Sequence, residues 1–437
     1  MGGAVFGFAP AIVNSMVGHV SMATAGLLPV IVSLNIAAWT TTKRRRVGIG
    51  LGLAALAQVL IGEEILFQAG LATFVMLVVQ LLSRPKTFWS AVPGALWVYA
   101  WALAVFLPLA AYPLYTQLFG PMRSQDSPFW IDYFAADLTS FTTRSENIWN
   151  GPANEIAALP GGGPAEHLVY LGLPLLLTCL AMILLRQADP RVRAAGAGFV
   201  TFAVLSMGGT LWVHGEQTKL AMPYHLLGKV PVLERALPSR LGVVTAMFAA
   251  ALLALALDAL ACSARSSART LAAAGLVGLV AVTLLPRPLA VEPVPDIPRY
   301  FSTAARELPH GTRAFVVPVA TPHHTEPMRW QQAADFSYST PDGYFLAPSG
   351  EERRTLIGVN PGPIEQVFVS LEEDGTVPAI TPELSQALWK QLDDWGVTTV
   401  ILGPSVHFQQ HADLLTRFLG EPRVDADGVK VWFLAPA

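Results

Sequence analysis

The sequence predicts a polytopic α-helical membrane protein followed by a C-terminal extracytoplasmic α/β domain. Of its 437 residues, 53% are hydrophobic and only 14% are charged, against about 25% charged in an ordinary soluble domain. The mean hydropathy is +0.47. A chain this apolar satisfies its backbone hydrogen bonds inside helices that cross a bilayer. This composition therefore excludes a wholly soluble protein.

The charge and the cysteine content exclude two further classes. A net charge of -3 leaves no cationic surface for a nucleic-acid backbone, so no nucleic acid is expected as a partner. The two cysteines, Cys179 and Cys262, lie in or beside apolar runs. They form no disulfide framework.

About nine stretches have the length and apolarity of transmembrane helices, since a helix needs roughly 20 residues to cross the hydrocarbon. Glu63 and Glu64 divide one long stretch into two spans, because a charged pair is costly in hydrocarbon but not in a surface turn. The predicted spans are about 2–17, 20–40, 47–64, 65–83, 88–117, 167–186, 194–213, 241–262 and 270–286. We therefore assign residues 1–286 to a transmembrane domain and expect 1–17 to be a retained span rather than a cleaved signal.

Basic residues in the short turns predict the orientation, because Lys and Arg are retained on the cytoplasmic side. The turns at 43–46, 84–86, 186–193 and 265–269 hold eleven basic residues and one acid, Asp189. The N-terminus is therefore expected in the cytoplasm of a bacterial plasma membrane. The loops 118–166 and 214–240 and the C-terminal region are expected outside.

Residues 287–437 are predicted to form the extracytoplasmic soluble α/β domain. Short β-branched runs at 313–319, 397–403 and 429–435 are typical of buried strands. Thr381 and Pro382 begin a helix, as a hydroxyl N-cap followed by proline at the first helical position. The segment 328–345 is rich in aromatics and amides; core packing is favoured there over stacking on sugar rings.

The candidate site residues all map to the predicted outer face. Glu63 and Glu64 are candidate catalytic carboxylates, as a general base or as ligands of a divalent cation, the one cofactor left open. Arg235 and Arg240 are close enough in sequence to grip one phosphate group. The other candidate substrate-binding residues are His19, Asp137, His225 and Lys229.

Each of these residues also has a structural interpretation. Arginine and lysine side chains at helix ends often extend to the interface, and loop aspartates such as Asp137 often cap helices. Glu63 and Glu64 also suit a solvated turn. The histidines show no fixed metal-binding spacing, so no metal site is assigned.

Five segments carry a resemblance to the bacterial GT-C-type multi-spanning glycosyltransferases. They are GFAPAIVNSMVGHVSMATAGLLPV (7–30), GLAALAQVLIGEEILF (52–67), the loop 133–141, MPYHLLGKVPVLERALPSR (222–240) and MRWQQAADFSYSTPDGYF (328–345). The resemblance implies transfer of a sugar from a polyprenyl-phosphate carrier on the outer face. The acceptor is expected to be a glycan, lipid or protein of the cell envelope, with membrane lipids as further partners.

One region expected in that family has no counterpart among the segments that resemble it. Members are expected to begin with further spans whose first outer loop carries the aspartate that activates the acceptor hydroxyl, whereas this sequence opens in an apolar helix at Met1. No residue is therefore assigned the role of that aspartate. The chain is expected to be a membrane glycosyltransferase or the C-terminal portion of one.

Two other functions remain open from the sequence. A transporter or flippase of a lipid-linked saccharide would use the same cations to bind the headgroup, although it is expected to carry ionisable groups near the bilayer midplane. The second alternative function is a non-catalytic membrane scaffold that presents the C-terminal domain.

Overall fold

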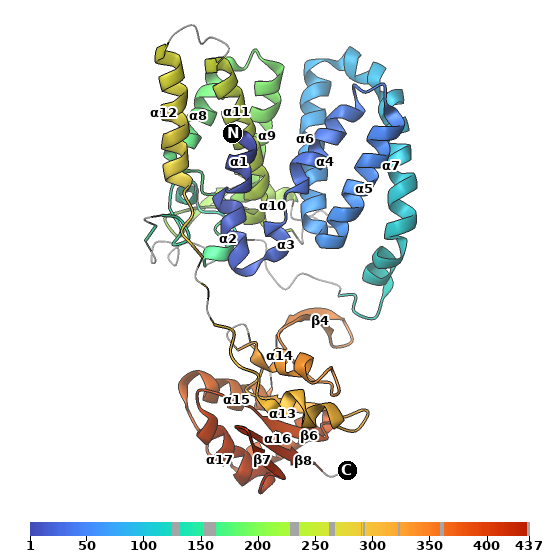
Figure 1. Cartoon of the computed structure of the whole chain (residues 1–437), viewed down its shortest axis with the longest axis vertical. Helices are drawn as coiled ribbons and strands as arrows, with labels where there is room; N and C mark the ends of the chain where they lie inside the picture. Colours follow the sequence, from blue (N-terminus) through green and yellow to red (C-terminus); the bar gives the residue numbers. More distant parts are fainter. Residues whose placement is uncertain are drawn as a thin grey trace. The chain divides into compact units, whose positions relative to one another are not determined.

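The computed structural model describes residues 1–124, 132–149, 151–152, 163–227, 236–261, 267–289, 291, 293–321, 324–358 and 362–434. The chain forms two compact units (Figure 1). The first is a helical unit made of Met1–Gly120 and Phe129–Ala290. The second is a mixed unit made of Pro121–Pro128 and Val291–Ala437. Lys229, Arg235 and Cys262 lie outside the described residues.

The first four helices are short and are separated by breaks. They are α1 (Gly2–Gly7), α2 (Pro10–Gly18), α3 (Val20–Ala23) and α4 (Leu27–Ala38). Pro10 begins α2 because its missing N–H costs nothing at a first helical position. The stretches 2–17 and 20–40 are thus each divided between two helices, which corrects the expectation of one continuous span in each.

Three long helices follow, α5 (Arg44–Ile61), α6 (Glu63–Ser83) and α7 (Pro85–Phe119). Gly62 separates α5 from α6, so Glu63 and Glu64 occupy the first turn of α6, where the helix dipole favours acids. Gly48 and Gly52 let α5 approach α7 closely, since a Cβ on Gly52 would lie 2.6 Å from the carbonyl oxygen of Ala102.

The rest of the helical unit contains α8 (Gly172–Arg186), α9 (Pro190–Ser206), α10 (Tyr224–Leu227), α11 (Gly242–Ala261) and α12 (Ser267–Leu284). Helix α11 packs in the centre of the unit against α8 and α9. Phe248 of α11 stacks on Phe202 of α9 with ring centroids 6.0 Å apart. The 3-10 turns η1 (Leu138–Phe141), η3 (Pro164–Glu166) and η5 (Pro238–Leu241) lie in the connections.

The predicted span 194–213 ends earlier than expected. Helix α9 stops at Ser206, and residues 210–213 form strand β1 (Thr210–Val213), which pairs antiparallel with β2 (Glu216–Ala221). Gly208 has a φ of 77°, and Asp132 accepts a hydrogen bond of 2.6 Å from the Gly209 N–H. A left-handed glycine cannot continue a helix, so the last part of this predicted span is wrong.

Four described helical segments are long and apolar enough to cross a membrane: Glu63–Ser83, Pro85–Phe119, Pro238–Leu260 and Ser267–Leu284. Three shorter apolar segments are Gly2–Gly18, Leu27–Ala38 and Gly172–Arg186. These helices support a membrane protein. The count of nine spans, the orientation and the cellular membrane remain predictions.

The mixed unit contains a four-stranded sheet in the order β3-β6-β8-β7. Its strands are β3 (Ala314–Val317), β6 (Thr399–Leu402), β7 (Val424–Ala426) and β8 (Val429–Phe433); β3 and β6 are parallel, and β8 is antiparallel to both β6 and β7. A separate hairpin joins β4 (Leu346–Ser349) to β5 (Arg354–Ile357). The three runs predicted as strands therefore each contain one.

Helices cover both faces of this sheet, and each face packs against its own apolar core. They are α13 (Arg299–Ser302), the 3-10 turn η6 (Ala304–Glu307), α14 (Glu326–Ala333), α15 (Pro363–Asp374), α16 (Pro382–Asp394) and α17 (Phe408–Leu419). Thr381 caps α16 by accepting from the Leu384 N–H, as predicted. In the segment 328–345, Trp330 and Tyr338 are buried in the core.

Candidate functional site

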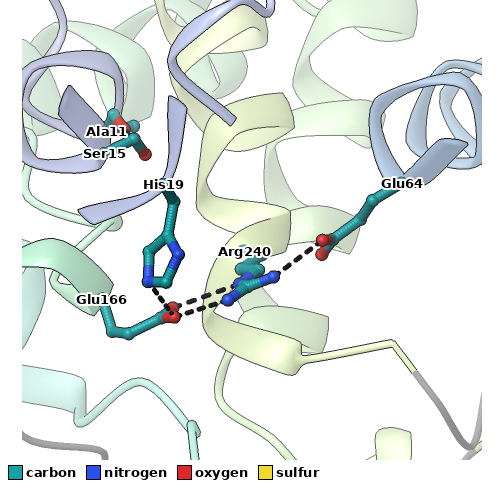
Figure 2. Close-up of polar contacts among 6 residues, drawn as sticks. All are labelled: Ala11, Ser15, His19, Glu64, Glu166 and Arg240. Carbon is teal, nitrogen blue, oxygen red and sulfur yellow. Dashed lines mark hydrogen bonds and ion pairs between the residues drawn. The ribbon is translucent and has the colours of Figure 1, made fainter. Parts of the chain in front are cut away.

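Four ionisable side chains from distant parts of the sequence meet in the helical unit (Figure 2). We call them the Arg240 cluster: His19, Glu64, Glu166 and Arg240. His19 lies at the break between α2 and α3, Glu64 in the first turn of α6, Glu166 in η3 and Arg240 in η5. Figure 1 places the α2–α3 break and the start of α6 at the same end of this unit.

Arg240 lies between the two carboxylates. Its Nε donates to Glu166 Oε2 at 3.2 Å and its Nη2 donates to Glu166 Oε1 at 2.6 Å. Its Nη1 donates to Glu64 Oε2 at 2.9 Å. The contact with Glu166 is therefore bidentate, the geometry that a planar guanidinium favours, whereas the contact with Glu64 uses one hydrogen bond.

His19 binds the same carboxylate from another side. Its Nε2 lies 2.8 Å from Glu166 Oε1. Since an ionised carboxylate only accepts hydrogen bonds, Nε2 carries the proton and, in the neutral ring, Nδ1 keeps its lone pair. The His19 side chain is 32% exposed and Glu166 only 7%. His19 is thus held by a buried anchor and remains accessible.

The environment of Glu166 keeps it ionised. Burial raises the pKa of its carboxyl, but hydrogen bonds from His19 and Arg240 lower it by more, so its pKa lies below the usual value. The cluster as a whole contains two carboxylates and one guanidinium. With a neutral His19, its negative charge exceeds its positive charge by one.

A buried hydrogen-bond network supports the loop that carries Glu166. Asn14 of α2 donates to the backbone carbonyl of His167 at 2.6 Å and accepts from Ser145 Oγ at 2.9 Å. The His167 Nε2 lies 2.8 Å from the backbone carbonyl of Thr143. Burial lowers the pKa of His167, so this ring stays neutral while it joins the two parts of the loop.

Three other candidates within the described residues, Glu63, Asp137 and His225, form no hydrogen bond or ion pair with this cluster. Glu63 is exposed on α6 and His225 is exposed on α10. Asp137 is fully buried and caps η1 through the Thr139 N–H, at 2.7 Å, while it also accepts from the Gly215 N–H at 2.8 Å. Both oxygens of Asp137 thus hold loops together, as the capping interpretation of that residue predicts.

Glu166 is the member of the Arg240 cluster that the sequence analysis did not assign to a site. Its sequence signal is weak, since a single acid after a glycine-rich segment is common in loops. Within the described residues, no group of three or more His, Cys, Asp or Glu side chains could hold a metal ion. In this cluster, the guanidinium of Arg240 occupies the position between the carboxylates.

The comparisons with known proteins show a likeness to a solved structure. No family model matches the chain, and no curated protein matches it. Among solved structures, the arabinofuranosyltransferase AftD from Mycobacteria is similar, with a TM-score of 0.51 and 15% sequence identity. The fold of this chain resembles that of part of AftD. The match covers 99% of this chain but only 31% of AftD.

This likeness agrees with the resemblance drawn from the sequence as far as the fold is concerned. At 15% identity it concerns the fold alone. The chain spans less than a third of the length of AftD. The likeness therefore does not identify the reaction, the donor or the acceptor of this chain.

Proposed function

We propose that this chain takes part in glycosyl transfer at a membrane, moving a sugar from a polyprenyl-phosphate carrier to an acceptor hydroxyl. The acceptor class is a cell-envelope glycan, lipid or protein, on the outer face of a bacterial plasma membrane. The observation that carries the proposal is the paired His19 and Glu166, held by Arg240 at 2.6 and 3.2 Å. The fold likeness to a membrane arabinofuranosyltransferase supports it.

His19 is the proposed general base. Its Nε2–H donates to Glu166 at 2.8 Å, which fixes the tautomer and stabilises the imidazolium that forms when Nδ1 takes a proton. The acceptor oxygen forms a bond to the anomeric carbon as the bond from that carbon to the phosphate oxygen breaks. The hydroxyl proton passes to His19 Nδ1, and the polyprenyl phosphate leaves as an anion.

Arg240 is proposed to act in two ways. Its bidentate pair positions Glu166, and its Nη1 faces Glu64, which is 29% exposed against 7% for Glu166. The departing phosphate is proposed to displace Glu64 from this more accessible side and to accept hydrogen bonds from Arg240. Glu64 is then a competitor that holds the guanidinium until the donor binds.

Lys229 and Arg235 remain proposed phosphate ligands. They precede Arg240 by eleven and five residues and lie outside the described residues. Cations near the leaving group would stabilise its developing charge. In the described part of the chain, His225, Asp137 and Glu63 form no hydrogen bond or ion pair with the Arg240 cluster, and we give them no part in the reaction.

The test is a transfer assay with the full chain in liposomes, supplied with labelled arabinofuranose on polyprenyl phosphate and a cell-envelope glycan acceptor. Label on the glycan, reduced about 100-fold or more by His19→Ala, is the expected result for loss of a general base. Equal transfer by His19→Ala and the unaltered chain would remove His19 from the reaction. Label moved across the bilayer without transfer would favour a flippase.

A further inference from the structure

The helical unit contains a cavity of about 880 Å³. Residues of six helices line it, α1, α4, α6, α7, α9 and α11, with α7 contributing Thr87. None of His19, Glu64, Glu166 and Arg240 contributes to its wall. Its volume falls within the roughly 300–1,000 Å³ of small-molecule sites.

The cavity wall is mostly apolar. Phe6, Val32, Met76, Leu77 and Phe248 contribute large side chains, and small residues of α11 such as Ala251 leave space between them. Five of the lining helices, α1, α4, α6, α7 and α11, belong to the apolar segments, and the segments of α6, α7 and α11 are long enough to cross a membrane. Such a wall suits hydrocarbon chains rather than a polar solute.

One end of the cavity carries cations. Arg84, at the end of α6, and Arg191 and Arg193, at the start of α9, all line it. Arg191 is paired with Asp189 at 2.9 Å. Among the described residues, no carboxylate forms an ion pair with the guanidinium of Arg84 or Arg193. Their charges are therefore not balanced by an ion pair within this part of the chain.

Cations at the end of an apolar cavity between membrane helices match the chemistry of an anionic phospholipid. Basic pockets between helices bind acidic headgroups, and each nearby Lys or Arg contributes to the attraction. A lone arginine at a helix end often extends to the interface without binding anything specifically. Two arginines from different helices on the wall of one apolar cavity provide both a phosphate contact and a place for acyl chains.

We propose that this cavity binds one anionic phospholipid, with its phosphate contacted by Arg84 and Arg193 and its acyl chains against α1, α6 and α11. The site is independent of the proposed glycosyl transfer. It lies at helix ends whose basic residues predict the cytoplasmic face. The residues of the Arg240 cluster lie in segments that the same pattern predicts on the outer face.

The test measures lipid retention by the full chain with native mass spectrometry. Delipidated protein in detergent is titrated with phosphatidylglycerol or with phosphatidylcholine. We expect preferential binding of one phosphatidylglycerol, and a drop of about tenfold to thirtyfold in its affinity for the double variant Arg84→Gln/Arg193→Gln. The matched control, Lys86→Gln/Arg186→Gln, removes the same charge from residues that do not line the cavity and should bind as the unaltered chain does.

A second variant tests the acyl-chain part of the site. Ala251→Phe fills the cavity and should lower retention of both lipids, and Leu77→Trp does so from α6 if Ala251→Phe fails to fold. Equal phosphatidylglycerol affinity in the Arg84/Arg193 variant and its control would overturn the headgroup contact. Undiminished retention by a folded filled variant, or no retained lipid in the unaltered chain, would overturn the cavity as the site.

Discussion

Arg240 and Glu166 form a bidentate ion pair in which the Nη2 to Oε1 distance is 2.6 Å and the Nε to Oε2 distance is 3.2 Å. The two residues are 74 positions apart in the sequence, and both side chains are largely buried, at 16% and 7% exposure. A buried pair of this kind is costly to break by removing one partner, because the other charge is left without compensation. It therefore fixes the loop at Glu166 to the start of α11.

Replacing Glu166 by glutamine is expected to impair both stability and transfer. The neutral amide leaves Glu64 as the only carboxylate partner of Arg240 and weakens the hydrogen bond that anchors His19, so the free energy of unfolding should fall by about 3–5 kcal/mol. Transfer should fall by about 100-fold or more. Thermal denaturation of the full chain in detergent and the assay above measure the two effects.

His19→Gln separates these two effects. This variant keeps the pair between Arg240 and Glu166, and it removes only the base. We expect kcat to fall while the Tm stays close to that of the unaltered chain. A Tm loss as large as that of Glu166→Gln would show that His19 acts in folding rather than in proton transfer.

Acid should weaken the same pair. The pKa of Glu166 lies below its usual value, since the hydrogen bonds from His19 and Arg240 outweigh burial. Its contribution to stability is therefore fully present above the unfolded pKa and is lost as the pH falls through the lowered folded pKa. The Tm of the unaltered chain should decline in that acidic range more steeply than the Tm of Glu166→Gln.

Glu64→Gln is expected to strengthen the binding of polyprenyl phosphate. Removing the charge that competes for Arg240 Nη1 should lower the Kd up to about tenfold, which corresponds to about 1.4 kcal/mol. Arg240→Lys, which cannot make a bidentate contact, should raise it. Titration of the full chain with polyprenyl phosphate measures both, and weaker binding by Glu64→Gln would contradict the competition.

Gly52→Val is expected to separate α5 from α7. A Cβ at Gly52 would lie 2.6 Å from the Ala102 carbonyl oxygen and 3.1 Å from Val105 Cβ. The clash should cost about 1–3 kcal/mol of stability. Gly70→Val is the matched control, because a Cβ at this position of α6 meets no atom within 4 Å. Equal Tm losses in the two variants would show that the α5–α7 contact is not tight.

The mixed unit should lose stability as the pH rises from about 4 to about 7. Asp342 is 8% exposed and its Oδ2 has no hydrogen-bond partner within the described residues. Burial, with a smaller contribution from Glu365, raises its pKa from 3.8 to about 7. The folded state therefore retains a proton that the unfolded state loses, and stability declines between about pH 4 and pH 7.

Asp342→Asn removes this dependence. Its Tm should match that of the unaltered chain near pH 4 and exceed it above pH 7. The corresponding difference in the free energy of unfolding above pH 7 is on the order of a few kcal/mol. Thermal denaturation of the full chain across this range is the measurement. A constant difference between the two proteins at all pH values would show that Asp342 does not titrate there.

The sequence predicts regular elements well because their signals are local. The strand at 314–317 and the Thr381 cap depend on a few neighbouring residues, and both appear in the structure. The end of α9 was missed since Gly208 and Gly209 stop the helix with the help of Asp132, which is 77 positions away. An apolar count does not detect such a contact.

The site was predicted only in part for the same reason. Arg240 and Glu64 stand out in the sequence because a cation follows a polar loop and a paired carboxylate interrupts an apolar stretch. Glu166 has no such signal, and its role comes from contacts with His19 and Arg240. The sequence predicted Arg240 as a phosphate ligand together with Arg235, and it gave no sign of the two carboxylates that Arg240 contacts in the structure.

The most direct test of the account is a structure of the full chain determined with a bound polyprenyl-phosphate sugar. We predict that the phosphate lies within hydrogen-bond distance of Arg240 and that Glu64 has moved away from Arg240 Nη1. We also predict that an open path leads to His19, through which an acceptor hydroxyl can reach it. A phosphate bound elsewhere, with the hydrogen bond of 2.9 Å between Arg240 and Glu64 intact, would contradict the proposed site.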